Sequence, residues 1–281
     1  MLRATNGTGG DVVIEDGTTA PQRFYRLATE PVPWNSLIAS NLGSVGSAAN
    51  GAYLGSTSHG VDGALTSDST NKATGFTDGV VSIPALSQFN TANAFSIELW
   101  LKPSVLNGIY VYPTPCLAGS YYSEYYQPNT VRLNGWSLHQ ADPSFSNGNG
   151  FYFRLYNTSG DTAFTAASAA LQVSTNEWYH VVGTYDGSTI SLYVNGELAN
   201  SVAAGGPFRP NVKYPLTFGA RSNGSYTYTG LLDEAAFYTN ALSASQVLAH
   251  YQAGTNSAPS VPYSQLILGD NPAGYWRLDE H

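Results

Sequence analysis

The sequence predicts an all-β sandwich with one short helix near its C-terminal end. The segment from Phe95 to Lys102 alternates apolar and mostly polar residues with a period of two, as a half-buried strand does. The dipeptides Asp186-Gly187 and Asn195-Gly196 separate apolar runs and are typical of tight turns between antiparallel strands. Charged residues make up only 11% of the 281 residues, which excludes a coiled coil or a charge-rich disordered tail.

The sequence patterns that predict strands are weak before residue 94 and clear after it. Residues 1–32 carry two short apolar runs, which we interpret as strands that end a preceding module. Residues 41–79 are rich in Gly, Ser and Ala and predict loops and short strands. After Phe95 to Lys102, we expect strands at Phe151 to Tyr156, Trp178 to Tyr185, Thr189 to Val194, Leu216 to Arg221 and Leu231 to Tyr238.

The predicted helix begins after Ser243. Gln246 follows three residues later, which is the spacing of a capping box. Val247, Leu248 and Tyr251 share one helical face. Gly254 is placed to end the helix, and residues 255–262 have the Asn, Ser and Pro content of a linker.

Residues 107–150 contain an unusual number of aromatic side chains and prolines. This composition predicts a long aromatic loop or an elaborated hairpin, and loops longer than about 15 residues are uncommon unless they are functional or disordered. A structural alternative is that the tyrosines simply cover the sandwich, because tyrosine is amphipathic.

The charges and the cysteine count exclude several classes of function. A net charge of −8 disfavours nucleic acid binding, and no apolar run approaches the 18 residues of a transmembrane helix. The lone Cys116 excludes an intramolecular disulfide.

Glycan-cleaving enzymes need two carboxylates, one on either side of the glycosidic bond. Here Glu98 stands alone on its strand, and the adjacent Asp233 and Glu234 are expected on opposite faces. We therefore predict no enzymatic activity, although a cross-strand pair of Glu98 and Glu234 is an alternative.

Three segments together carry a family resemblance. They are Phe95 to Pro103, Asn176 to Gly187 with its continuation to Tyr193-Val194-Asn195-Gly196, and Gly230 to Ala235 followed by the helix. In this order and spacing, the chain resembles a laminin-G-like domain of the concanavalin A-like lectin/glucanase superfamily. The resemblance covers residues 33–254 and implies a two-sheet antiparallel jelly-roll sandwich.

The C-terminal residues resemble the opening of a second copy of the same domain. Residues 263–280 end in Tyr275-Trp276-Arg277-Leu278-Asp279-Glu280, and Phe24-Tyr25-Arg26-Leu27 echoes this run ahead of the domain. We therefore interpret residues 255–281 as a linker and the opening strand of a following repeat. Residues 272–280 are expected either to pack on the sandwich as an edge strand or to remain disordered.

The start of the chain lacks the apolar stretch of a signal peptide. The protein is therefore either cytoplasmic or, as we favour, a piece of a longer secreted bacterial protein.

The resemblance also implies a structural calcium ion. Related domains commonly use the acid of the Leu-Asp-Glu segment, which is Asp233 here, together with an early Gly/Asn-rich loop. That loop commonly holds an Asp in relatives, whereas Asn41 and Asn50 stand there in this chain.

Three functions are compatible with these features. The first is a non-catalytic carbohydrate-binding module of a secreted or surface protein, in which aromatic rings stack on sugars and polar side chains bind the hydroxyls. The second is an adhesion or spacer module that binds protein partners or neighbouring repeats, since aromatic residues also mark protein interfaces. The third is a glycan hydrolase or lyase. For the first function, the candidate ligand-binding residues are Tyr121, Tyr122, Tyr125, Tyr126, Arg132, Trp136, Tyr226 and Tyr228.

Overall fold

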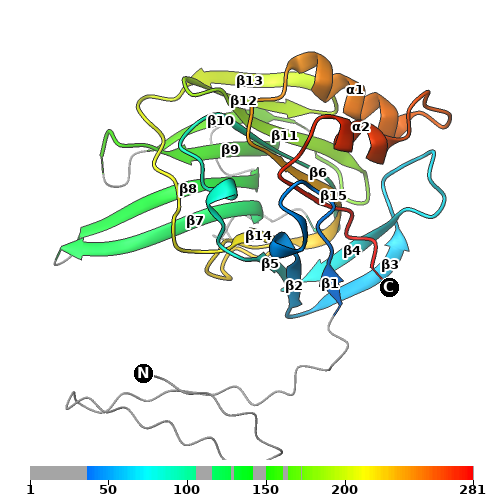
Figure 1. Ribbon diagram of the computed structural model, residues 1–281, viewed down its shortest axis with the longest axis horizontal. Coiled ribbons are helices and arrows are strands. Elements are labelled where there is room, and N and C mark those ends of the chain that lie inside the picture. The colour runs from blue at the N-terminus through cyan, green and yellow to red at the C-terminus, as the bar shows by residue number, and fades with distance from the viewer. Residues whose placement is uncertain are drawn as a thin grey trace, which may run out of the picture. The chain divides into compact units, whose positions relative to one another are not determined.

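A computed structural model describes residues 37–105, 116–127, 130–141, 150–160, 164–171 and 173–280 of the chain. These residues form two antiparallel sheets, each with eight described strands, and two short helices lie beside one of the sheets (Figure 1). The predicted all-β sandwich is confirmed. The structure adds a second helix to the one that we predicted.

The first sheet has the strand order β1-β2-β5-β14-β7-β8-β9-β10. In Figure 1, β7 and β8 form a long hairpin that extends beyond their neighbours. The aromatic region therefore contains an elaborated hairpin, as one of our two alternatives predicted. The bounds are β1 Ile38–Ala39, β2 Gly51–Leu54, β5 Val80–Ile83, β14 Leu216–Phe218, β7 Cys116–Gln127, β8 Thr130–Ala141, β9 Gly150–Tyr156 and β10 Phe164–Ala170.

The second sheet has the order β13-β12-β11-β6-β15-β4-β3, and a last strand, β16, pairs with β15. Its turns lie where the Asp-Gly and Asn-Gly dipeptides predicted them, between β11 and β12 and between β12 and β13. The bounds are β13 Glu197–Ala203, β12 Thr189–Val194, β11 Tyr179–Tyr185, β6 Phe95–Pro103, β15 Thr229–Tyr238, β4 Lys72–Thr77, β3 Thr57–Asp62 and β16 Gly274–Trp276. Two 3-10 turns, Gly46–Ala49 and Ser87–Phe89, complete the connections.

Strand β6 is buried on both faces, although its sequence alternates. Phe95, Ile97, Leu99 and Leu101 enter the core between the two sheets. The opposite face, which carries Trp100, is also buried, because a second apolar cluster lies there under the helices.

The helices α1 (Ala244–Thr255) and α2 (Tyr263–Gly269) form this second layer on the outer face of the second sheet. The predicted capping box begins α1: the Gln246 amide donates to the Ser243 hydroxyl, and the Ser243 amide donates to the Gln246 side chain. The helix continues one residue past Gly254. A Cβ at Gly254 would lie 2.4 Å from the Trp100 ring, so this position needs a residue without a side chain.

The C-terminal segment closes the sandwich. Strand β16 pairs with β15 on one side, and on the other side the amides of Leu42 and Val45 donate to the carbonyls of Tyr275 and Ala273. Trp276 is fully buried in the core. Our expectation of an edge strand is therefore wrong in one respect, because the segment has neighbours on both sides. Although we assigned residues 255–281 to a linker and a following repeat, α2 and β16 pack in the same compact unit as the sandwich.

Candidate functional site

Five side chains form a continuous row on the outer face of the first sheet: Arg154, Tyr152, His139, Tyr226 and Arg221. The guanidinium of Arg154 lies 4.9 Å from the centre of the Tyr152 ring, and that ring stacks on His139 with centroids 4.8 Å apart and planes at 15°. The His139 ring meets Tyr226 edge-on at 6.3 Å. The guanidinium of Arg221 lies 3.7 Å from the centre of the Tyr226 ring. We call these five residues the aromatic–arginine row.

Strand alternation and register place the row on this face. On β9, Phe153 enters the core, so its neighbours Tyr152 and Arg154 face outward. His139 on β8 lies directly opposite Tyr152. Tyr226 comes from the loop before β15, where its backbone has a φ of 62° and its carbonyl accepts a hydrogen bond from the Cys116 amide.

Most of the row is buried, and exposure is confined to two of its members. His139 has no exposed surface, Tyr152 and Arg221 are each 8% exposed, and Arg154 and Tyr226 keep partial exposure. Cys116 and Ser137 also have no exposed surface. Burial raises the pKa of Cys116 to about 12, although Arg221 and Arg154 oppose that shift, so the thiol is neutral. The Ser137 hydroxyl has no hydrogen-bond partner among the described residues.

Two predicted ligand-binding residues lie in the core instead. Trp136 is 1% exposed and packs against Phe95 and Phe153, because it shares the inward face of β8 with Leu138. Tyr228 is fully buried, and its hydroxyl donates to the Leu231 carbonyl. Neither ring is available for a sugar, so both assignments are corrected.

The other predicted residues lie on or near the same sheet. Tyr226 belongs to the row. Arg132 is a partly exposed residue of β8, in register with Glu124. Our selection missed Tyr152, Arg154, His139 and Arg221, although an arginine within the aromatic strand Phe151 to Tyr156 was a usable signal. The remaining four, Tyr121, Tyr122, Tyr125 and Tyr126, lie on β7, but their side chains are outside the described residues.

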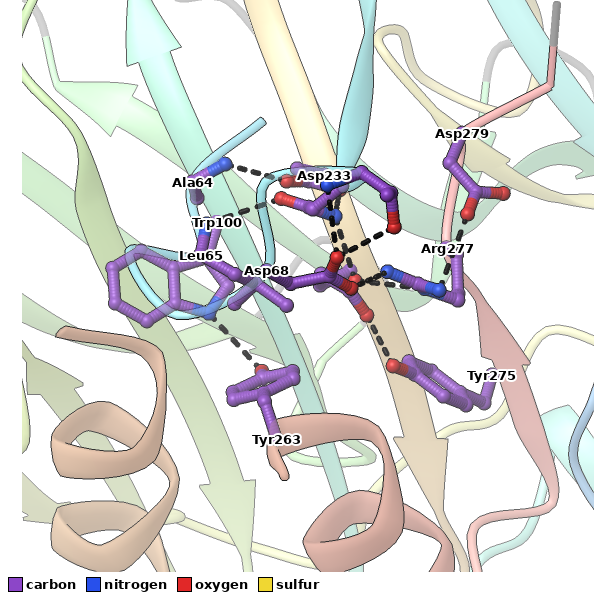
Figure 2. Close-up of polar contacts among 12 residues, drawn as sticks. Ala64, Leu65, Asp68, Trp100, Asp233, Tyr263, Tyr275, Arg277 and Asp279 are labelled. Carbon is purple, nitrogen blue, oxygen red and sulfur yellow. Dashed lines mark hydrogen bonds and ion pairs between the residues drawn. The ribbon is translucent and has the colours of Figure 1, made fainter. Parts of the chain in front are cut away.

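A second polar site lies on the other sheet around Asp233 of β15 (Figure 2), and the neighbouring Glu234 converges on the same partner, Asn71. Both are fully buried, and the Asn71 amide donates to Glu234 at 2.9 Å and to Asp233 at 3.4 Å. Our expectation that they point to opposite faces is wrong. The pairing of β15 shifts register between Asp233 and Ala236, and Glu234 adopts a φ of 50°, so this bulge turns both carboxylates to one side.

Arg277, from the C-terminal segment, supplies the positive charge of this acidic cluster. Figure 2 shows its side chain reaching toward β15, where Nε lies 3.0 Å from Glu234 Oε1 and Nη2 lies 3.0 Å from Asp68 Oδ2. The Tyr275 hydroxyl also donates to Glu234. Burial raises the pKa of Glu234 to about 7 against the effect of Arg277. Burial and the charge of Glu234 raise the pKa of Asp233 well above its ordinary value.

The predicted calcium ligands do not fit one ion. Asp233 accepts from the Ala64 amide at 2.7 Å and from Asn71, so its oxygens face N–H donors. Asn41 and Asn50 contact each other: the Asn41 amide donates to Asn50 Oδ1 at 2.9 Å. The Asn41 side-chain oxygen accepts from the Tyr275 amide. Calcium needs converging oxygen ligands that are free to coordinate, whereas a side-chain oxygen of each of Asp233, Asn41 and Asn50 already accepts a backbone N–H.

We therefore expect calcium removal to leave the stability of the chain unchanged. The melting temperature of the full chain should be the same in calcium and in EDTA, since bound calcium would stabilise the folded state by mass action. Differential scanning calorimetry in the two buffers checks this. A melting temperature several degrees lower in EDTA would show that an ion is bound.

The third polar cluster is buried under the helices. Glu98 of β6 has no exposed surface and lies 2.8 Å from His250 Nδ1, and His250 Nε2 lies 2.9 Å from Asp270. The hydroxyls of Tyr238 and Tyr263 also donate to Glu98. Glu98 and Glu234 are the alternative catalytic pair of the sequence analysis. Both are buried, and each is bound by other side chains of the fold.

Comparison with known proteins supports the architecture. Residues 73–248 match the family model of the Concanavalin A-like lectin/glucanases superfamily. No sequence of a curated protein matches the chain. Among the described residues, no helix is long and apolar enough to cross a membrane.

Two solved structures are similar in fold. One is domain 4 of AbnA, a GH43 extracellular arabinanase from Geobacillus stearothermophilus, in complex with arabinotriose. Its TM-score is 0.53 at 19% identity, over 75% of this chain and 96% of that one. The other is the binding domain of Paraclostridial Mosquitocidal Protein 1, with a TM-score of 0.50 at 19% identity, over 77% of this chain and 52% of that one.

Proposed function

The chain belongs to the concanavalin A-like lectin/glucanase superfamily, and on this premise we propose that it is a non-catalytic carbohydrate-binding module of a secreted or surface protein. The aromatic–arginine row on the outer face of the first sheet carries this proposal. A domain of similar fold, from an extracellular arabinanase, is in complex with arabinotriose. That complex belongs to the other protein and supports only the class of ligand.

The row offers the two kinds of contact that a sugar needs. The partly exposed Tyr226 ring provides an apolar surface for the C–H face of a pyranose or furanose ring, and Arg154, the other partly exposed member of the row, carries N–H donors suited to hydroxyl oxygens. Tyr226 is partly exposed, and its backbone is anchored by the Cys116 amide, so little ordering entropy is lost on binding. At about 1 kcal/mol for each stacked ring, together with hydrogen bonds, the affinity falls in the micromolar to millimolar range.

The buried carboxylates favour binding over catalysis. Glycan hydrolysis requires two carboxyl groups about 5–9 Å apart on either side of the bond. Glu98, Asp233 and Glu234 lie on the second sheet, fully buried and hydrogen-bonded to neighbouring side chains. They serve the packing of the fold and face away from the row.

The parent protein is proposed to be a longer, multidomain chain. The run Tyr275 to Glu280, which completes this sandwich, is echoed by Phe24-Tyr25-Arg26-Leu27 ahead of the domain, and this echo supports an array of such domains. Neighbouring copies would raise avidity for a polymeric glycan without new contacts. The competing proposal, an adhesion or spacer module that binds protein partners, becomes the leading one if no glycan is bound.

The test is a glycan microarray followed by a pull-down with insoluble polysaccharides. We expect Tyr226→Ala to weaken retention about five- to tenfold, the loss of one ring stack, while the melting curve stays unchanged. The matched control is Trp178→Ala, which removes a partly exposed ring that also lies near a cation, Lys102, but on the second sheet. Equal losses in the two variants, or retention unaffected by Tyr226→Ala, would place the site elsewhere.

A further inference from the structure

We infer that the C-terminal segment of one copy of this chain can close the sandwich of a second copy, so that two copies are joined by exchanged segments. The segment, residues 263–280, carries α2 and β16, and the hinge, residues 256–262, leads to it from α1. The segment lies in a slot between β15 on one side and residues 41–45 on the other. The interaction surface is this slot, and its partner is the same segment of a second copy.

The slot recognises the segment by its side chains as well as by strand pairing. The Asn41 side-chain oxygen accepts from the Tyr275 amide at 2.7 Å, and the Trp276 indole donates to the Ala49 carbonyl at 2.8 Å. The Trp276 ring also packs in the core between the two sheets. These contacts fix which residue of the segment lies at each position of the slot.

The last residues of the segment are held by partners that are distant in sequence. The Thr74 hydroxyl donates to the Leu278 carbonyl at 3.0 Å. Glu280 accepts from the Ser40 amide and from the Tyr53 hydroxyl. These partners lie 204 to 240 residues earlier in the chain. The contacts are therefore the same whether the segment comes from the same copy or from a second one.

Charge makes the slot selective for a segment that carries an arginine. Arg277 lies 3.0 Å from both Glu234 and Asp68, and Glu234 and its neighbour Asp233 are fully buried. A slot without its arginine would leave buried carboxyl groups without a counter-charge, which is strongly unfavourable. A slot that has lost its own segment is therefore best refilled by a segment of the same chemistry, and a second copy supplies one.

The hinge is less closely packed than the elements that it joins. All of its residues are exposed except Pro259, which is partly exposed. The Ala258 amide donates within the hinge, to the Asn256 side chain at 3.0 Å. Two cavities, of about 420 and 250 Å³, are lined in part by hinge residues, and in Figure 1 the hinge projects as a loop beside α1 and α2. Few packing contacts would be lost if the hinge opened.

An exchanged pair would keep the slot contacts of two separate copies, since each segment enters an identical slot. The two states then differ in the conformation of the hinge and in the entropy of association. Pro262 is already extended, with φ −55° and ψ 142°, and prolines hold the residues before them in extended conformations, which suits a hinge that bridges two copies. Hinge length and protein concentration should therefore set the balance between the two states.

Refolding of the full chain from urea at low and at high protein concentration is the first test. We expect dilute refolding to give a monomer and concentrated refolding to give a second species of about twice that mass. Light scattering during size-exclusion chromatography measures the mass. The dimer should have the near-ultraviolet circular dichroism of the monomer, because the packing of each sandwich is the same. A chain that stays monomeric at every concentration would overturn the inference.

Two variants of hinge length identify the surface that joins the copies. Deletion of residues 257–260 should make the dimer the main species even after dilute refolding, because the segment no longer reaches its own slot. An insertion of equal length, made of Gly and Ser after Ser257, is the matched control and should favour the monomer. A dimer fraction that does not depend on hinge length would mean that a different surface joins the copies, and it would overturn the inference.

A mixture of two full-length variants decides the matter if the shortened chain folds poorly. Arg277→Glu and Glu234→Arg each place like charges in their own slot, so each alone should unfold at a lower urea concentration than the unmodified chain. In a mixed exchanged dimer, both slots again hold opposite charges. Refolding the two variants together should therefore give a one-to-one dimer that resists urea better than either variant. A mixture that behaves as the sum of its parts would contradict exchange.

Discussion

Arg277→Met is expected to lower the free energy of unfolding by about 3–5 kcal/mol, because it leaves a buried carboxylate without its counter-charge. Arg277 lies 3.0 Å from Glu234, which has no exposed surface, and it also pairs with Asp68 and Asp279. The measurement is urea unfolding at pH 8, where Glu234, with a pKa of about 7, is ionised in the folded chain. Methionine keeps much of the buried length of the side chain, so the loss reports the charge.

The control for this change is Lys72→Met. Lys72 pairs with Asp62, whose side chain is 95% exposed, and exposed ion pairs contribute about 1 kcal/mol or less. A loss below about 1 kcal/mol for Arg277→Met would show that Arg277 does not hold the C-terminal segment against β15.

His250→Gln is expected to be nearly as damaging, at about 3–5 kcal/mol near pH 6, because it removes the positive charge between Glu98 and Asp270. Burial opposes the charged imidazole, yet the two carboxylates outweigh it and raise the pKa of His250 to about 9, above the ordinary value of 6.5. The folded state therefore holds this proton more tightly than the unfolded state. The stabilisation is complete below pH 6.5 and is lost as the pH rises through 9.

The pH dependence distinguishes this ion pair from simple packing. The difference in unfolding free energy between the unmodified chain and His250→Gln should shrink between pH 6.5 and 9. His59→Gln is the control: burial lowers the pKa of His59 below its ordinary value of 6.5, so the folded state binds this proton less tightly than the unfolded state. The difference for His59→Gln should therefore rise slightly near pH 6.5 and then stay constant, and it should not shrink. A His250→Gln difference that does not change with pH would mean that the imidazole acts only by packing.

Local patterns in the sequence predicted much of the fold. The alternation from Phe95 to Lys102 gave β6, and the spacing of Ser243 and Gln246 gave the start of α1, because both depend on residues that are close in sequence. The missed helix α2 has seven residues, and no side chain caps its N-terminus. The contacts of α2 with Trp100 and Glu98 are long-range, so its own sequence carries little signal.

The candidate sites were harder to predict, because they depend on register and on a bulge. Trp136 was chosen as an exposed ring, but the register of β8 turns it into the core. Asp233 and Glu234 converge only because β15 is bulged, which strict alternation does not anticipate. The row brings together residues from β8, β9 and the loop before β15, and only the folded sheet places Tyr226 beside His139.

The most direct test of the central claim is hydrogen–deuterium exchange of the full chain with and without the glycan that it retains. The account predicts that protection on binding is concentrated in β8, in β9 and in the loop that carries Arg221 and Tyr226. A competing location is the cavity of about 420 Å³ lined by Asp68, Pro262 and Tyr263, beside the acidic cluster. Protection at that cavity, with no change across the aromatic–arginine row, would contradict the account.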